Sequence, residues 1–390
     1  MAAEPGGPGP DGRLRLSIDV SAVPARPVGA GQYTLELTRA LAARPDVDLV
    51  VVSRRADAPR WRETAGGATL VAAAPGPRPL RLAWEQLGLP KVLRRQRVDV
   101  HHGPHYTMPE LAREPSVVTV HDLSFFEAPA WHERSKVVLF RRAIRLAARR
   151  ASAIVCPSRA TAAELARWCR VRGPVVVAHH GVDAGRFRPT EPTPGSDAER
   201  LAGVDRRLSD GAPYLVFVGT LEPRKDVPTL VRAFAAVAAD HPDALLVLAG
   251  GAGWGADRVE EAVAASGVAG RVVRTGYVDD AVVPALLRSA RAAVYPALYE
   301  GFGLPALEAL ACGTPLVTTT GTAMEEVAGD AAVLVPPGDR SALTGAVESV
   351  LAGPGPGPDA RRRGIEVAAT HTWAASAERH LEAYRLAAER

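Results

Sequence analysis

A glycine-rich turn late in the chain has the residue types expected of a ligand-binding site. Residues 299–309 read YEGFGLPALEA and follow a short apolar run. Gly301 and Gly303 allow the backbone to approach a ligand closely and to adopt unusual dihedral angles. Pro305 suits the first turn of a helix, so we expect a helix to begin near Leu304. The free N–H groups at such a helix start would form an anion site.

Charged side chains flank this turn and follow another apolar run earlier in the chain. Glu300 precedes the turn and Glu308 lies on the expected helix. Carboxylates accept hydrogen bonds well from sugar and ribose hydroxyls. Gly219 ends the earlier run, and Arg224 and Lys225 follow it. Backbone N–H groups together with two adjacent cations would make a diphosphate site, although such a charged pair alone is more often a solvated surface feature.

Alternating apolar runs and helical patterns indicate the elements that position these residues. Many of the runs are nearly continuous Val, Ile and Leu, which is typical of strands buried on both faces of a parallel sheet. The expected strands are 14–20, 48–53, 69–73, 98–102, 116–121, 153–157, 175–179, 214–219, 244–250, 272–275, 292–295, 315–318 and 332–335. Helical patterns between them include 32–43, 134–150 and 159–170.

Two successive arrays of this kind predict an α/β protein with two doubly wound Rossmann-like domains facing one another across a cleft. Pro, Arg and Asp residues interrupt the pattern between the arrays. We expect a disordered leader at 1–12, a first domain at 13–185, a linker with a short helix at 186–212, a second domain at 213–364 and a terminal helix at 365–390.

Composition narrows the class of protein. The chain has 390 residues, of which 47% are hydrophobic, and a formal net charge of only +4. This small and dispersed excess does not favour nucleic-acid binding. Three scattered cysteines favour a reducing compartment, and we expect no membrane span and no signal peptide. The expected location is therefore cytoplasmic.

These motifs together resemble a known family. The second half resembles the donor domain of the two-domain retaining glycosyltransferases of family 4 (the GT-B fold), which includes many bacterial mannosyltransferases. The resemblance rests on two glutamates separated by seven residues around a G-F-G-x-P turn, here Glu300 and Glu308. Four further segments are similar to that family's first domain and hinge, namely YTLEL at 33–37, WEQ at 84–86, VHDL at 120–123 and GVD at 181–183.

The resemblance implies a role for individual residues. Glu308 would bind the donor ribose, Glu300 would lie near the transferred sugar, and Lys225 would bind phosphate. His121 would reach toward the sugar, so the catalytic residues implied are His121 and Glu300. The implied donor-binding residues are Gly29, Gly31, Gly219, Arg224, Lys225, Tyr277, Val278, Gly301, Phe302, Gly303, Leu304 and Glu308.

One position departs from the family pattern. Many relatives have arginine directly after the glycine at position 219, where this chain has Thr220. Arg224 is the candidate to supply the missing guanidinium, depending on where its side chain points.

The resemblance implies a metal-independent hexosyltransferase without a cofactor. The look of the first domain favours GDP-mannose as donor, and the acceptor would be a glycan, a lipid-linked glycan or a small molecule. The terminal helix of relatives returns to the first domain, and Trp373, Ala377, Leu381 and Tyr384 recur at the helical spacing that such packing requires.

Other readings of the residues remain open. A sugar-nucleotide epimerase of the same fold, a phosphorylase or a non-catalytic nucleotide-sugar-binding protein would share the two-domain plan. A nicotinamide dehydrogenase would need G-x-G-x-x-G after a strand, and residues 29–34 (GAGQYT) have Thr34 where the third glycine would stand.

Two further features have competing interpretations. His101, His102 and His105 resemble a metal cluster, but neighbouring strand residues point to opposite faces, so a packed strand end is favoured. Arg134–Arg150 has one basic face, which suits either docking on anionic lipid at the inner membrane face or simple solvation.

Overall fold

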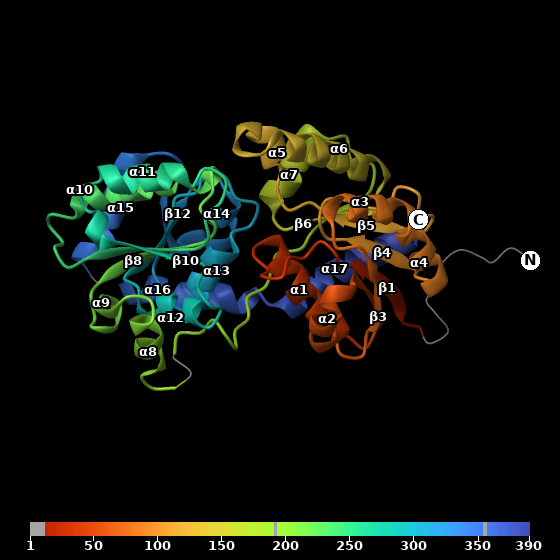
Figure 1. Ribbon diagram of the computed structural model, residues 1–390, viewed down its shortest axis with the longest axis horizontal. Coiled ribbons are helices and arrows are strands. Elements are labelled where there is room, and N and C mark those ends of the chain that lie inside the picture. The colour runs from red at the N-terminus through yellow and green to blue at the C-terminus, as the bar shows by residue number, and fades with distance from the viewer. Residues whose placement is uncertain (1–11, 191–192, 354–356) are drawn as a thin grey trace, which may run out of the picture. The chain divides into compact units, whose positions relative to one another are not determined.

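The chain forms two compact units. The computed structural model describes residues 12–190, 193–353 and 357–390 (Figure 1). The first unit comprises the described residues up to Pro129 together with Glu133–Gly181 and Trp373–Arg390, and the second comprises Ala130–His132 and the described residues of Val182–Thr372. Nearly all of the expected leader, residues 1–11, lies outside the described residues.

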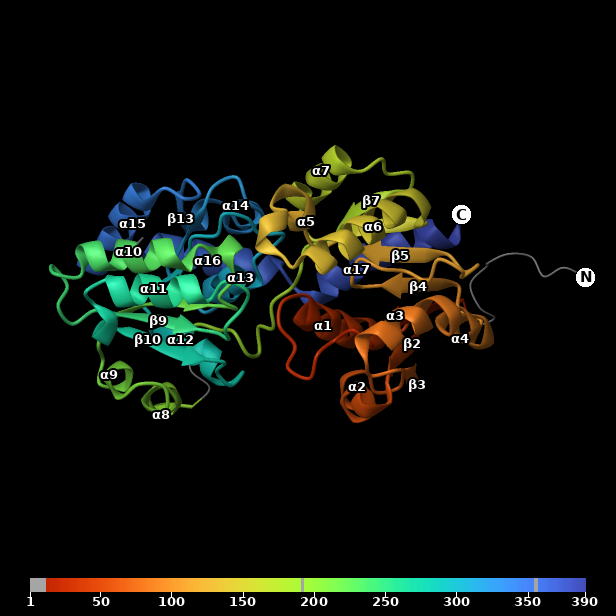
Figure 2. The same cartoon turned by 45° about the horizontal axis from the view of Figure 1, so that its top comes forward.

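The first unit contains a sheet of seven parallel strands. Its order is β3-β2-β1-β4-β5-β6-β7, and Figure 2 shows β4 and β5 side by side. The strands are β1 (Leu14–Asp19), β2 (Val47–Arg54), β3 (Thr69–Ala74), β4 (Val100–Gly103), β5 (Ser116–Thr119), β6 (Ala153–Cys156) and β7 (Val175–Val177). All seven expected strands are present, and their ends differ from the predicted ends by at most two residues.

Helices cover both faces of this sheet. They are α1 (Ala30–Ala42), α2 (Ala58–Thr64), α3 (Arg78–Leu87), α4 (Leu89–Gln96), α5 (Ser124–Glu127), α6 (Arg134–Arg150), α7 (Arg159–Trp168) and α17 (Trp373–Ala388). Buried side chains of α1, α2 and α17 share one core cluster, whereas those of α5, α6 and α7 form another. Alternation along β2 agrees, since Val51 joins the first of these clusters and Val50 packs with α4.

The terminal helix α17 completes the first unit. Crossovers between parallel strands are right-handed, so the helices that connect β3 to β7 lie on the face of the sheet opposite α1. None of these connecting helices therefore covers the α1 side of β4 to β7. Helix α17 contacts α1 and strands β4, β5, β6 and β7, and in Figure 1 its blue ribbon lies among red and orange elements. The fully buried residues Ala377, Leu381 and Tyr384 face this core, as their spacing predicts.

The second unit contains a sheet of six parallel strands in the order β10-β9-β8-β11-β12-β13. The strands are β8 (Tyr214–Val218), β9 (Leu245–Ala249), β10 (Val272–Gly276), β11 (Ala292–Tyr295), β12 (Leu316–Thr319) and β13 (Ala332–Val335). Each of these six was also expected from its apolar run.

Helices of the second unit pack in pairs as well as on the sheet. They are α8 (Ser196–Ala202), α9 (Arg206–Ser209), α10 (Val227–Val237), α11 (Asp257–Ala265), α12 (Val282–Ser289), α13 (Leu304–Ala311), α14 (Ala323–Ala328), α15 (Arg340–Ala352) and α16 (Gly357–Thr370). Helix α10 packs on α15, and α13 packs on α16.

Two expected boundaries need correction. Residues 186–212 were expected to be a linker with one short helix, but the described part of this segment belongs to the second unit and contains both α8 and α9. The expected boundary at residue 365 falls inside α16, which packs on α13. The part of the tail that joins the first unit therefore begins at Trp373.

No helix in the described part of the chain combines the length and the apolar composition needed to cross a bilayer.

Candidate functional site

The two motifs of the second half follow adjacent strands, β8 and β11. The strand order reverses between these strands, since β9 lies on one side of β8 and β11 lies on the other. Ligands of open α/β sheets bind outside the carboxyl ends of the strands at such a reversal. Gly219 comes directly after β8 with a φ of 148°, and its N–H donates to the Ala249 carbonyl at 2.8 Å. The sequence therefore places both motifs at the expected edge of the sheet.

Gly303 sets the start of the helix that follows β11. It precedes α13 in the left-handed region, with a φ of 90°. A Cβ atom at this position would also lie 2.4 Å from Cγ of Met324. A side chain here would therefore both strain the backbone and clash with Met324. The helix begins at Leu304, as Pro305 predicts, and its first N–H groups face the carboxyl edge of the sheet.

Lys225 is a partly buried cation at this edge. A Cβ atom on Gly219 would lie 2.6 Å from its Nζ, so only glycine leaves room for the ammonium there. Burial lowers the pKa of Lys225, and the nearby Glu300 carboxylate opposes that shift. Among the residues that the structure describes, the Lys225 ammonium has no hydrogen-bond or ion-pair partner. Its nearest aromatic contact is the Phe217 ring, whose centroid lies 5.8 Å from Nζ. A partly desolvated ammonium without a hydrogen-bond or ion-pair partner is the expected state of a group that meets an anionic ligand.

The Arg224 side chain points to the carboxylates of this region. Its guanidinium forms an ion pair with Glu300 and donates to Oε2 of Glu222 at 2.9 Å. The Leu298 N–H donates to the Arg224 carbonyl at 2.8 Å, which ties this turn to the loop before Glu300. Arg224 therefore orients Glu300 in this structure.

Glu308 is the second partly buried charge of the site. Burial raises the pKa of Glu308 to about 7, with Arg186 and Lys225 opposing the shift and Asp280 reinforcing it. Within residues 12–190, 193–353 and 357–390, its carboxylate has no hydrogen-bond or ion-pair partner. It can accept hydrogen bonds from a ligand's hydroxyls.

Sequence reasoning missed Arg186 as part of this site. Its guanidinium donates to the Asp280 carbonyl at 2.7 Å, and it lies near enough to Glu308 to act on the pKa of that carboxyl. Arg186 lies in the segment predicted to be a linker, where arginine is common, so no local signal distinguished it.

Tyr277 and Val278 lie where a nucleotide base was expected. Strand β10 ends at Gly276, whose φ is 64°, and the loop that follows carries both residues. Tyr277 is 44% exposed and Val278 is partly buried against the core. Their position at the carboxyl edge of the sheet is compatible with base contacts, which stay a prediction.

The first unit holds the remaining predicted residues at the carboxyl edge of its own sheet. Gly29 has a φ of 50° and precedes α1. A Cβ atom on Gly31 would meet side-chain atoms of Pro24 and Pro27 at 3.3 Å, so the loop packs closely on it. His121 lies two residues after β5. The three residues thus follow β1 and β5, as the sequence predicts.

His121 is fixed by one hydrogen bond and by surrounding rings. Its Nε2–H donates to the Pro104 carbonyl at 2.7 Å, and burial lowers the pKa of the imidazole. Tyr33 and Tyr106 pack edge-on against it, with ring centroids 4.9 Å and 5.4 Å away. Tyr106 has a φ of 65°, a left-handed conformation that costs a bulky residue roughly 1–3 kcal/mol and is concentrated at functional sites.

Comparison with known proteins assigns the family. Residues 27–186 match the family described as Glycosyltransferase Family 4, and residues 204–370 match the family described as Glycosyl transferases group 1. The chain is 30% identical to the O-antigen chain mannosyltransferase B of Escherichia coli over 79% of its own length and 78% of that protein. The chain belongs to glycosyltransferase family 4. It is 31% identical to the 2-deoxystreptamine N-acetyl-D-glucosaminyltransferase of Streptomyces fradiae over 72% of this chain and 66% of that one.

Solved structures show that this glycosyltransferase has the GT-B fold. The sucrose-phosphate synthase of Thermosynechococcus elongatus is similar with a TM-score of 0.76 at 22% identity, covering 96% of this chain and 98% of that one. The Anabaena protein HepE in complex with UDP-glucose is similar with a TM-score of 0.73 at 18% identity, covering 95% and 99%.

The three histidines near β4 pack within the first unit of the glycosyltransferase. Nδ1 of His101 lies 3.1 Å from the Ser17 hydroxyl, whereas Nε2 of His102 lies 2.8 Å from the Thr119 hydroxyl. The two rings thus lie on opposite faces of the strand, as predicted. In the described residues, no group of three or more His, Cys, Asp or Glu side chains is placed to hold a metal ion.

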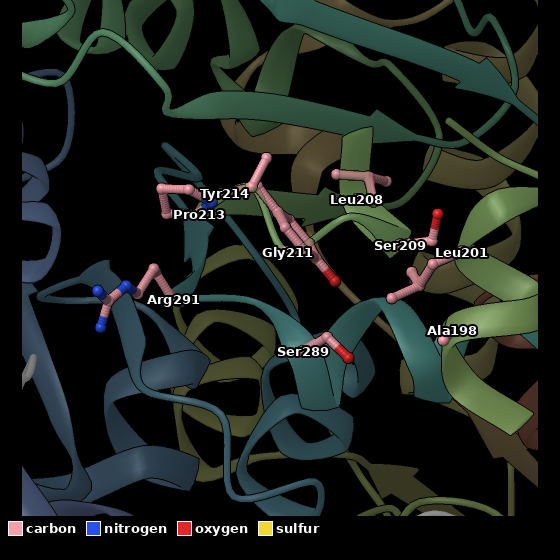
Figure 3. Close-up of a pocket in the computed structure, with 10 residues that line it drawn as sticks. Ala198, Leu201, Leu208, Ser209, Gly211, Pro213, Tyr214, Ser289 and Arg291 are labelled. Carbon is pink, nitrogen blue, oxygen red and sulfur yellow. The ribbon is translucent and has the colours of Figure 1, made fainter. Parts of the chain in front are cut away.

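A separate cavity of about 520 Å³ lies in the second unit (Figure 3). Tyr214 and Arg291, which line it, stand at the amino ends of β8 and β11. The cavity is therefore at the edge of the sheet opposite to Lys225 and Glu308. Ala198, Leu201, Leu208 and Ser209 close it from α8 and α9, which the sequence did not connect with any site.

Proposed function

We propose that this glycosyltransferase moves a hexose from a nucleoside diphosphate sugar with retention of anomeric configuration. The observation that carries the proposal is the partly buried Lys225 ammonium, which lies beside the Gly219 turn and has no hydrogen-bond or ion-pair partner among the described residues. Helix α13 starts at the same edge of the sheet after the turn at Gly303. A cation and a helix N-terminus at one strand reversal suit a diphosphate.

Charge governs the chemistry that we propose. When the glycosidic bond breaks, positive charge develops on the sugar and negative charge on the departing diphosphate. Lys225 and the N–H groups of α13 would stabilise the diphosphate, and preorganised electrostatic stabilisation of this kind is usually the largest catalytic contribution. We therefore propose that the reaction needs no divalent metal, because a protein cation takes the role that a metal has in other transferases.

The two glutamates would have different tasks. Glu308, which has no partner in the described part of the chain, would accept hydrogen bonds from the ribose hydroxyls. Glu300 would lie against the transferred sugar, with Arg224 holding its carboxylate in place through their ion pair. From the first unit, His121 would contact the sugar through the ring edge that the Pro104 bond leaves available.

GDP-mannose is the donor that we propose to test first. The E. coli relative is an O-antigen chain mannosyltransferase, and a second relative, from Mycolicibacterium hassiacum, is an MMP alpha-(1->4)-mannosyltransferase, 31% identical over 54% of this chain. Other relatives carry other names, among them glycogen synthase of Mycobacterium tuberculosis, so UDP-glucose is the matched alternative. The acceptor would be a glycan, a lipid-linked glycan or a small hydroxyl compound in the cytoplasm.

Peripheral contact with an anionic membrane through α6 is part of this proposal. Arg134, Arg142, Arg145 and Arg149 are exposed along one side of the helix, and Val138 is 71% exposed among them. Glu110 already neutralises Arg142 through a 2.6 Å ion pair. The charge available for lipid is therefore smaller than the sequence alone suggests.

A ligand-induced thermal shift tests the donor site directly. GDP-mannose and UDP-glucose are each added to the wild type and to Lys225→Met, with EDTA present throughout. A ligand at about 100 times its Kd adds about 2.7 kcal/mol to the stability of the folded state. We expect a rise in Tm for one nucleotide sugar with the wild type and little or none with Lys225→Met.

The control is Lys91→Met, which removes a charge in α4 of the first unit, whereas Lys225 belongs to the second, and this variant should keep the full shift. A shift that depends on Mn²⁺ or Mg²⁺ would overturn the metal-independent mechanism. An equal shift in Lys225→Met would overturn the diphosphate assignment.

A further inference from the structure

A chain of hydrogen bonds runs through the buried core of the first unit. The Tyr33 hydroxyl lies 2.8 Å from Nε2 of His380 and 2.8 Å from the Thr119 hydroxyl. Thr119 in turn lies 2.8 Å from Nε2 of His102, and Nδ1 of His102 lies 2.9 Å from the Tyr384 hydroxyl. All five side chains are buried, so each polar atom depends on this chain for its partner.

One end of this hydrogen-bond chain fixes which atom donates in every hydrogen bond along it. Nδ1 of His380 lies 2.7 Å from the Ser376 carbonyl, which can only accept, so this nitrogen carries the proton. Burial lowers the pKa of His380 to about 4, so the ring is neutral and its Nε2 accepts from Tyr33. The Tyr33 oxygen must then accept from Thr119.

The remaining donors and acceptors of the hydrogen-bond chain follow from the same reasoning. Because the single Thr119 proton goes to Tyr33, its oxygen must accept from Nε2–H of His102. Burial keeps the pKa of His102 well below its usual value, so that ring is also neutral and its Nδ1 accepts from Tyr384. Only this assignment satisfies all five bonds, and it gives the two histidines opposite tautomers.

Both ends of this hydrogen-bond chain belong to helix α17. Ser376, His380 and Tyr384 are one turn apart on its buried face, whereas Tyr33 comes from α1 and Thr119 from the end of β5. The Tyr33 hydroxyl therefore bonds directly to the helix through His380, and its second bond, to Thr119 of β5, reaches the helix through His102 and Tyr384. The Tyr33 ring, in turn, packs edge-on against the His121 imidazole at a centroid distance of 4.9 Å and an interplanar angle of 82°.

We propose that Tyr33 is a positioning residue for His121, held in place by this directed hydrogen-bond chain from α17. The inference rests on the proposed role of His121 toward the transferred sugar. The Pro104 bond fixes one nitrogen of His121 but leaves rotation about that bond, and the Tyr33 ring blocks this rotation from one side. The C-terminal helix thereby sets the orientation of a side chain that lies far from it in the sequence.

The test compares two substitutions that each remove one buried hydroxyl. Tyr33→Phe breaks the bonds to His380 and Thr119. Tyr214→Phe is the matched control, because Tyr214 is also fully buried and its hydroxyl donates to the Leu286 carbonyl at 2.8 Å. Tyr214 lies in the second unit, at the amino end of β8, whereas Lys225 and Glu308 lie at the carboxyl edge of that sheet. Each is also combined with His121→Ala, and release of GDP from GDP-mannose is measured along with Tm.

We expect Tyr33→Phe to lower kcat by about tenfold with little change in KM, since a small misplacement of a reacting group costs rate rather than binding. In the His121→Ala background the same substitution should leave kcat unchanged, while its effect on Tm persists. Tyr214→Phe should lower Tm to a comparable extent and leave kcat unchanged in both backgrounds. Equal losses of kcat from Tyr33→Phe with and without His121 would overturn the proposal and leave the proposed function standing.

Histidine-selective ¹⁵N NMR spectra test the same proposal without a substrate. The wild type should show His380 as the Nδ1–H tautomer, and His102 and His121 as Nε2–H tautomers. Tyr33→Phe should shift or broaden the His121 signals, whereas Tyr214→Phe should not. If GDP-mannose is not turned over and His121→Ala has no effect on any donor, the proposed function fails. Unchanged His121 signals in Tyr33→Phe would overturn the positioning role by themselves.

Discussion

Lys225 and Glu308 are charged side chains that the fold partly buries without giving them a hydrogen-bond or ion-pair partner among the described residues. Burial moves both toward neutrality, since it lowers the pKa of Lys225 and raises the pKa of Glu308 to about 7. A protein keeps such groups at a cost in stability, which is a common feature of binding sites. A bound diphosphate would favour the charged form of Lys225.

Glu308→Gln should make the stability of the ligand-free protein less dependent on pH. The folded-state pKa of Glu308 is raised above its usual 4.5, so the folded protein binds this proton more tightly than the unfolded chain does. The resulting penalty is absent below pH 4.5, grows as the pH rises from 4.5 to about 7, and is fully present above that. We expect Glu308→Gln to raise Tm at pH 8 by ~2–4 °C, the effect of roughly 1 kcal/mol, and to leave it unchanged near pH 4.5.

Differential scanning fluorimetry across this pH range gives the measurement, and Glu261→Gln, at an exposed position of α11, serves as the control. The same substitution should weaken donor binding at pH 8, because an amide accepts hydrogen bonds from ribose less well than a carboxylate does. A parallel pH profile for the wild type and Glu308→Gln would show that the carboxyl is not buried as described.

Sequence reasoning predicted these site residues because glycine, proline and charged residues occur together at strand ends. It could not assign the partner of Arg224, because that choice depends on how the turn at 223–226 packs against residues 298–300. Arg186 was missed for a similar reason, since its place beside Glu308 comes from tertiary packing. Side-chain pairing across elements leaves little trace in local sequence.

The α13 turn shows how one element positions several groups. Gly303 must adopt a φ of 90° for α13 to begin directly after β11, and Met324 of α14 occupies the space where a side chain would lie. The strand runs, the Pro305 helix start and the buried Val/Ile/Leu pattern were predictable because they are local. The closeness of Met324 was not, because it joins two helices that follow different strands.

Gly303→Ala should damage the donor site more than an equivalent substitution elsewhere. Gly321 is the matched control, because its φ of 69° is also left-handed but nothing lies within 4 Å of a Cβ atom there. Gly321→Ala should therefore cost only the conformational strain, about 1–2 kcal/mol. Gly303→Ala adds a clash with Met324 and should lower Tm further and abolish the thermal shift caused by the donor. Equal effects on Tm and on the donor shift in both variants would show that the turn does not require glycine for room.

The order of elements in the whole chain explains why its last helix belongs to the first unit. The connections after β3 leave the α1 side of β4 to β7 uncovered, and α17 packs there. The chain passes from the first unit to the second after Gly181 and returns after Thr372. These two passages are joined, since the Val182 N–H donates to the His371 carbonyl at 2.9 Å. The sequence predicted the returning helix from its apolar spacing but placed its start eight residues early, because α16 has a similar pattern.

Removal of α17 by a stop after Thr372 should unfold the first unit and leave the second largely intact. The loss exposes the core side of β4 to β7 and deletes Leu381 and Tyr384, whose burial contributes roughly 1.5–3 kcal/mol each. It also leaves His102 without the Tyr384 bond, at a cost of roughly 1–3 kcal/mol. The sum is a large part of the roughly 5–15 kcal/mol that stabilises a typical domain.

Hydrogen exchange measured by mass spectrometry distinguishes the two units within one chain. Peptides that contain β5 and β6 should lose protection in the truncated protein, whereas peptides that contain β8, β9 and β11 should keep it. A chain that stops after Ala388 is the control, because it retains all of α17 and lacks only two residues. Since Lys225, Glu308 and the α13 turn all lie in the second unit, the truncated protein should still bind the nucleotide part of the donor but should not transfer the sugar. Full protection of β5 and β6 after truncation, with normal transfer, would show that α17 supports neither the core of the first unit nor His121.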